Sequence, residues 1–240
     1  MKYLILLISI SISTPSFSQF GDLLKKADKV KNDILGDNSN LDISGGLKEA
    51  LEKGVDASVQ SLSAKNGFFD SPYKILIPEE AQKVVSTVSK VPGFNNVEKD
   101  LLAKMNEAAE YATKKATPIF LNAIKNMSFT DAKNILMGEK NAATTYLDNS
   151  SRKQLYDEFL PVIQTALDEV NARQYWSDVV NQYNKVPFIK KVNPELDDHV
   201  NQKALDGLFS LIEKKELGIR EDIDQRTSPL LKKVFAEQDN

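Results

Sequence analysis

The apolar residues of the chain recur at helical spacing along most of its length. In residues 47–62, 97–112 and 200–212 they fall three or four positions apart, with polar residues between them. This period predicts amphipathic α-helices. One short run, residues 73–77, has a β-like composition, but it is too short and isolated to form a sheet. The pattern predicts an all-α protein, an irregular multi-helix bundle with no significant sheet.

Caps, prolines and glycines predict where these helices begin and end. Ser128 followed by Asp131 resembles a capping box, and Gly138 follows the apolar run of the helix that the box opens. Thr117-Pro118 predicts a break in the helix that begins near residue 97. Ser228-Pro229 opens a final short helix. Further helices are predicted over residues 142–148, 152–170 and 172–183, and from residues 193–195 onward.

The first eighteen residues have the parts of a secretory signal peptide. Lys2 supplies a positive start, residues 3–12 are apolar, and Ser16 and Ser18 occupy the small-residue positions before a cleavage site. An uncleaved membrane anchor is the alternative, but the apolar run has about half of the roughly 20 residues that span a bilayer. We predict cleavage after Ser18 and export, with the periplasm as the first and the extracellular space as the second destination.

Residues 19–40 read as an amphipathic helix followed by a flexible linker. The helix covers Phe20 to Leu35, with lysines on its polar faces, and residues 36–40 favour turns. Such a helix can pack on its own protein, dock on a partner or lie on a membrane surface. The remaining residues, 41–240, are predicted to form a single helical domain, with two lobes as the alternative.

Composition limits the functions that the chain can have. It contains no cysteine, so its stability in an oxidising compartment must come from a packed core rather than disulfides. The formal net charge is -3, from 31 basic and 34 acidic residues that are interspersed along the chain. This balance argues against a nucleic-acid partner.

The chain offers few groups for catalysis or metal binding. His199, the only histidine, follows Glu195 and Asp198, and a hydrolase that uses His199 with these carboxylates is an alternative hypothesis. A single imidazole without cysteine is a poor zinc site. The acidic stretches 37–42 and 222–224 do not fit a calcium loop. We therefore predict no metal, no cofactor and no catalytic residue.

Six aromatic residues lie in or beside predicted loops and are candidates for a groove that holds an apolar ligand. The alternative is that they close the ends of the helical bundle, because aromatic side chains commonly dominate core burial. The candidates are Phe68, Phe69, Tyr73, Trp176, Tyr183 and Phe188.

Several motifs follow one another in an order that resembles a known family. They are GLKEAL at 46–51, PIFLNAIKNM at 118–127, AATTY at 142–146, ALDGLF at 204–209 and LLKKVF at 230–235. Together they resemble a domain-of-unknown-function family of exported bacterial proteins. The resemblance implies an all-helical envelope protein of Gram-negative bacteria, most simply periplasmic, and implies no activity.

Three arginines match that family pattern: Arg152, Arg220 and Arg226. We expect them to form ion pairs with helix acids that fix the packing of the bundle, and an anion-binding site is the alternative. The chain departs from the pattern at Asp222-Ile223, where an Asp-Pro turn is expected, so this turn is predicted to be looser.

These observations favour a non-enzymatic envelope protein. It would be a helical binding or scaffolding module whose partner is a protein, a lipid or a small apolar molecule. The alternatives are the His199 hydrolase and a peripheral membrane protein attached through Phe20 to Leu35.

Overall fold

The computed structural model describes residues 43–78, 82, 85, 95–188 and 190–236. The predicted signal peptide and the Phe20 to Leu35 helix lie outside the described residues. All of the described residues belong to one compact unit of the chain, Asp42–Asn240.

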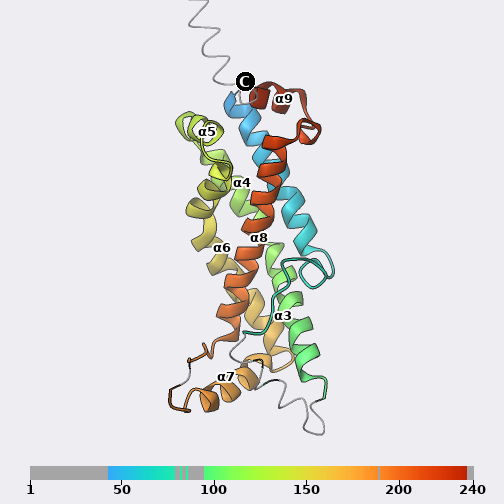
Figure 1. Cartoon of the computed structure of the whole chain (residues 1–240), viewed down its shortest axis with the longest axis vertical. Helices are drawn as coiled ribbons and strands as arrows, with labels where there is room; N and C mark the ends of the chain where they lie inside the picture. Colours follow the sequence, from blue (N-terminus) through green and yellow to red (C-terminus); the bar gives the residue numbers. More distant parts are fainter. Residues whose placement is uncertain (1–42, 79–81, 83–84, 86–94, 189, 237–240) are drawn as a thin grey trace, which may run out of the picture. The chain divides into compact units, whose positions relative to one another are not determined.

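Every regular element of the described residues is a helix, which confirms the all-α prediction. None of these helices combines the length and the apolar character that crossing a membrane requires. The elements, most of them labelled in Figure 1, are a helix over residues 43–63, α3 Val97–Thr113, α4 Ala116–Asn126, α5 Phe129–Leu136, α6 Ala142–Asp168, α7 Ala172–Tyr183, α8 Leu196–Glu221, η1 Ile223–Gln225 and α9 Pro229–Phe235.

Helix α6 is the central element, because it packs against α3, α4, α5, α7 and α8. The prediction of two separate helices in this region is wrong. The helix continues through residues 149–151, where the Ser150 and Ser151 hydroxyls donate to carbonyls one turn earlier. Ser151 is buried between the core residues Leu147 and Leu155, so tertiary packing overrides the local preference for a turn.

Two predicted caps are confirmed, whereas the helix expected to open at residues 193–195 begins at Leu196 without a side-chain cap. The Ser128 hydroxyl accepts from the amide of Asp131, while the Asp131 carboxylate accepts from the amide of Ser128, which completes the capping box of α5. The Ser228 hydroxyl accepts from the amide of Leu231 and caps α9, with Pro229 at its first position. The break near Pro118 falls slightly earlier than predicted, between Thr113 and Ala116, which leaves the proline in the first turn of α4 where it needs no donor.

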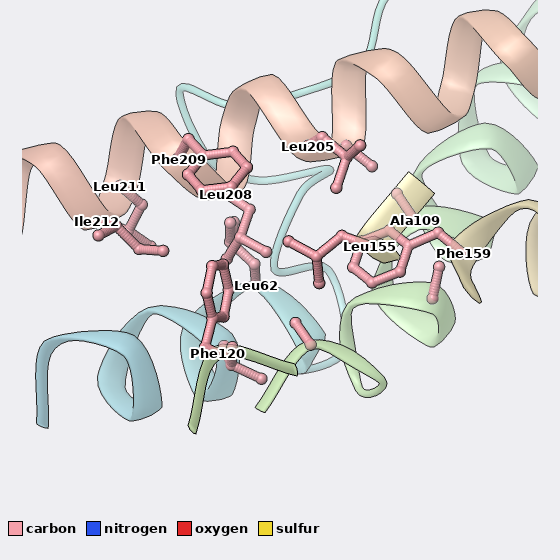
Figure 2. Close-up of a cluster of buried hydrophobic side chains, with 14 of the residues drawn as sticks. Leu62, Ala109, Phe120, Leu155, Phe159, Leu205, Leu208, Phe209, Leu211 and Ile212 are labelled. Atoms are coloured by element: carbon pink, nitrogen blue, oxygen red, sulfur yellow. The ribbon is translucent and has the colours of Figure 1, made fainter. Parts of the chain in front are cut away.

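The core is formed where the helix of residues 43–63, α3, α4, α6 and α8 meet (Figure 2). The side chains labelled there are leucine, isoleucine, alanine and phenylalanine. Phe120 of α4 and Phe209 of α8 meet edge to face, with ring centroids 5.6 Å apart and planes at 87°. This arrangement places the positive edge of one ring against the negative face of the other.

A buried ion pair on α8 joins three helices. The side chains of Glu216 and Arg220 are each only 7% exposed, and Arg220 Nη2 lies 2.8 Å from Glu216 Oε1. Glu216 also accepts from the amides of Ala143 and Thr144 at 2.9 and 2.8 Å, which are the second and third positions of α6. It therefore caps α6 from another helix, where the preceding Asn141 supplies no side-chain cap.

Arg220 completes the same junction at the end of α5. Its guanidinium donates to the carbonyls of Ile135 and Leu136 at 2.8 and 3.2 Å. These carbonyls belong to the last turn of α5, and the Ile135 carbonyl also accepts from the amide of Gly138 at 3.2 Å. Glu216 and Arg220 together therefore hold the α5–α6 connection against α8.

We predict that Glu216→Gln destabilises the protein by about 3–5 kcal/mol, because it removes the carboxylate charge that lies 2.8 Å from the buried Arg220 guanidinium. The measurement is the free energy of unfolding in urea, followed by circular dichroism. Glu213→Gln, an exposed site one turn away, is the matched control and should change stability by about 0.5 kcal/mol or less. Equal effects of the two substitutions would contradict a special role for the buried pair.

Candidate functional site

A groove lies between α3 and α7, which are close to each other in Figure 1. It encloses about 670 Å³, within the roughly 300–1,000 Å³ typical of small-molecule sites. Most of its lining is apolar and the remainder is a polar edge on and just before α3. The apolar residues are Val85, Leu101, Ala103, Val170, Ala172, Tyr175, Trp176 and Val179, and the polar ones are Asn95, Asn96, Asp100, Lys104 and Glu107.

Helix α7 lines this groove because its apolar surface is too wide for one packing contact. Val180 is buried in the core, while Tyr175 and Val179 face the groove and Tyr175 is 57% exposed. Trp176 takes part in both surfaces, since it is buried and also lines the groove. Its indole N–H donates to the carbonyl of Asn193 at 3.0 Å, which fixes the orientation of the ring.

The polar edge of the groove has an ion pair as its centre. Lys104 Nζ lies 2.7 Å from Glu107 Oε2, and the Tyr111 hydroxyl donates to Glu107 Oε1 at 2.8 Å. The hydrogen bonds from Lys104 and Tyr111 lower the pKa of Glu107, and the bond to Glu107 raises the pKa of Lys104. Both groups are therefore charged at neutral pH, and their charges offset each other at the edge of the groove.

Sequence reasoning identified Trp176 as a site candidate but missed Tyr175, Val179 and Lys104. A signal for α7 was present, because apolar residues at 172, 175, 176, 179 and 180 span two adjacent helix faces. No comparable signal marks Lys104, whose place at the groove depends on where α7 packs.

The six aromatic candidates have different surroundings. Trp176 lines the groove, whereas Phe68 is fully buried in the core. Tyr73 is half-buried and packs with Phe68 against Gly207 of α8, where an added Cβ would lie 3.1 Å from the Phe68 ring. The remaining three differ again: Phe69 lies under the Lys74 ammonium, Tyr183 packs on the core and Phe188 is fully exposed.

A buried carboxylate holds the loop that carries Phe68. Glu110 of α3 accepts from the backbone amides of Asn66 and Phe68 at 3.1 and 3.4 Å. Asn66 has a left-handed backbone, with φ of 61°, a conformation that asparagine tolerates better than most residues. Burial raises the pKa of Glu110, although the bonds from the backbone amides partly oppose that shift.

The three candidate arginines are held by protein groups. Arg152 donates to Asp148 one turn earlier and to Asp206 of α8 at 3.1 Å. Arg220 belongs to the junction with Glu216 described above. Arg226 is only 2% exposed and donates to the carbonyls of Ile219 and Arg220 at 3.0 and 2.9 Å, so that it caps the end of α8. Arg220 and Arg226 meet at the ring of Phe235, but Arg152 is not part of this pair.

The turn after α8, where the chain departs from the family pattern at Asp222-Ile223, is closed by a side chain. The Asp222 carboxylate accepts from the amide of Asp224 at 2.9 Å and closes the short helix η1. This side-chain cap supplies the local restraint that a proline would otherwise have given.

His199 bonds to the backbone of another segment. Its Nε2 lies 3.0 Å from the carbonyl oxygen of Leu76, so the ring links α8 to the extended residues 74–78. The adjacent Asp198 accepts from the Tyr156 hydroxyl at 2.7 Å, and this bond raises the pKa of Tyr156 to about 12. Within the described residues, no three His, Asp or Glu side chains are grouped so that they could hold a metal ion.

Comparison with known proteins identifies one family. The family model described as "Protein of unknown function (DUF4197)" matches residues 37–236. No curated protein and no solved structure matches the chain. The match covers every described helix, and it agrees with the resemblance that the sequence motifs indicate.

We predict that Glu110→Gln changes how stability depends on pH. Because burial raises the native pKa of Glu110 above its unfolded value, ionisation costs the native state stability as pH rises through that pKa, and glutamine cannot ionise. The melting temperature of the variant, relative to the parent protein, should therefore rise between about pH 4 and pH 7. Glu98→Gln, an exposed site on the same helix, is the control. A relative melting temperature that falls over this range would contradict desolvation of Glu110.

Proposed function

We propose that this chain, which belongs to the DUF4197 family, is a non-enzymatic binding protein of the cell envelope. Its binding site is the groove between α3 and α7, and its ligand is an apolar molecule, either a small molecule or the chain of a lipid. The observation that supports this is the volume of about 670 Å³ lined mainly by aliphatic and aromatic side chains. A concave apolar surface with a few polar groups at one edge is the usual form of such a site.

The edge of the groove favours a ligand with a neutral polar end. The charges of Lys104 and Glu107 offset each other, and Asn95 and Asn96 carry amides that can both donate and accept hydrogen bonds. A strongly charged ligand would gain little from this edge, since the nearest cation already has a carboxylate partner. A hydroxyl or ester group at the end of an apolar chain fits these donors and acceptors.

The contacts of His199 support a binding function over hydrolysis. Its ring bonds to a backbone carbonyl, and the carboxylate of Asp198 accepts from Tyr156, Asn193 and Gln202. Through these bonds Asp198 joins α6, the segment before α8 and the next turn of α8. The predicted signal peptide supports the envelope as the compartment, with the periplasm as the first destination and secretion as the second.

Trp176 makes the proposal directly measurable, because it is the only tryptophan of the chain and lines the groove. Titration with dodecanol should give a saturable change in its fluorescence. Ala103→Phe places a ring in the groove from an exposed position of α3 and should weaken binding by about tenfold or more through steric overlap. Ala57→Phe, at an exposed position of the helix over residues 43–63, should leave binding unchanged.

Native mass spectrometry of the purified protein complements this titration by detecting a ligand that copurifies. Failure of dodecanol to change the Trp176 emission, together with the absence of any copurified apolar species, would overturn the proposal. Equal loss of binding in Ala57→Phe and Ala103→Phe would move the ligand away from the groove. A protein that copurifies and is lost only in Ala103→Phe would make the groove a protein-docking surface instead.

A further inference from the structure

The connection between α7 and α8 has a charge that differs from the rest of the chain. The chain as a whole carries a net charge of -3, yet no acidic residue occurs between Asp178 and Glu195. Three lysines lie in this interval, Lys185, Lys190 and Lys191. The loop over residues 185–191 is therefore a local cluster of positive charge in an acidic protein.

Two large apolar side chains lie at the tip of the same loop and face solvent. Phe188 is fully exposed and Val186 is 51% exposed. Phe188 also has a left-handed backbone, with φ of 63°. This conformation is unfavourable for a bulky residue, so neither local backbone preference nor burial in the protein explains a phenylalanine at this position.

The base of the loop is closed by side-chain hydrogen bonds. Asn184 donates through Nδ2 to the carbonyl of Val192 at 2.8 Å and accepts at Oδ1 from the Val192 amide at 2.9 Å. The Trp176 indole, bonded to the carbonyl of Asn193, adds a second tie to α7. These bonds hold Asn184 and Val192, on either side of the loop, next to each other.

We propose that the loop over residues 185–191 contacts the surface of an anionic phospholipid membrane. Phe188 and Val186 enter the interfacial region, where aromatic side chains are favourable, and the lysines bind lipid phosphates. The charge of the loop favours an anionic membrane as the partner. A loop with three lysines is attracted to an anionic surface, whereas the acidic remainder of the protein is repelled by it, so the loop is the part that makes contact. The contact is peripheral, and it rests neither on the groove nor on its ligand.

The test is flotation of the full-length protein with vesicles that contain about one-third phosphatidylglycerol in phosphatidylcholine. We expect binding that weakens at about 0.5 M salt and is lost on vesicles of phosphatidylcholine alone. Phe188→Gly should weaken binding by about tenfold or more. The same substitution should leave the melting temperature unchanged or higher, since glycine accepts the left-handed backbone. Lost binding with retained stability separates a surface role from a folding role.

The charge contribution is tested separately. Replacing Lys190 and Lys191 together with glutamine should weaken vesicle binding by about tenfold or more. Replacing Lys114 and Lys115, an adjacent exposed pair in the α3–α4 turn, is the matched charge control. Met137→Ser, at a 65% exposed apolar residue, is the matched apolar control. Both controls should bind vesicles as the parent protein does.

Phe188→Trp reports directly whether this side chain enters the membrane. The fluorescence emission of the new tryptophan should shift to the blue on anionic vesicles, whereas Trp176 is already buried.

The proposal is overturned if vesicle binding is absent, or if it persists in Phe188→Gly and in the double lysine variant. The second outcome would favour attachment through another segment, such as Phe20 to Leu35. Dimerisation abolished by Phe188→Gly, without vesicle binding, would instead assign the loop to contact between copies of the chain. Ala103→Phe should bind vesicles normally, so failure of the groove proposal does not affect this test.

Discussion

The packing of this helical protein depends on the buried ion pair between Glu216 and Arg220. Charges cost several kcal/mol to bury, and the cost is offset only when both partners are paired and their remaining hydrogen-bonding groups are satisfied. Here those groups bind the first amides of α6 and the last carbonyls of α5. Each end of a helix leaves backbone groups without intrahelical partners. The Glu216–Arg220 pair binds such groups at the start of α6 and at the end of α5, and each side chain also neutralises the charge of the other.

This junction restricts how the helices lie along one another. Leucine and isoleucine surfaces attract without strong directional preference, whereas the bonds to Glu216 allow one position of the start of α6 on α8. Helix α6 runs from this junction to Asp168, close to the start of α7 at Ala172. Because α6 packs against both α3 and α7, its position also determines the distance between the two walls of the groove.

Helix α7 joins the two proposed surfaces. Its inner residues pack on the core, its side at Tyr175 and Val179 lines the groove, and the lysine-flanked loop with Phe188 follows its end. Binding of an apolar molecule and contact with a lipid surface would then take place at the same end of the protein, where α7 lies in Figure 1.

The sequence alone determined the fold class and most helix boundaries, because these depend on residues near one another in the chain. The spacing of apolar positions, the Ser128 capping box and Ser228-Pro229 act within a few residues, and the structure agrees with them. Only the tertiary structure decided that residues 142–168 form one helix, that Glu216 caps it, and that Trp176 and Lys104 border one groove. Each of these features joins residues distant in the chain, and the helical period indicates which face is buried but not which helix covers it.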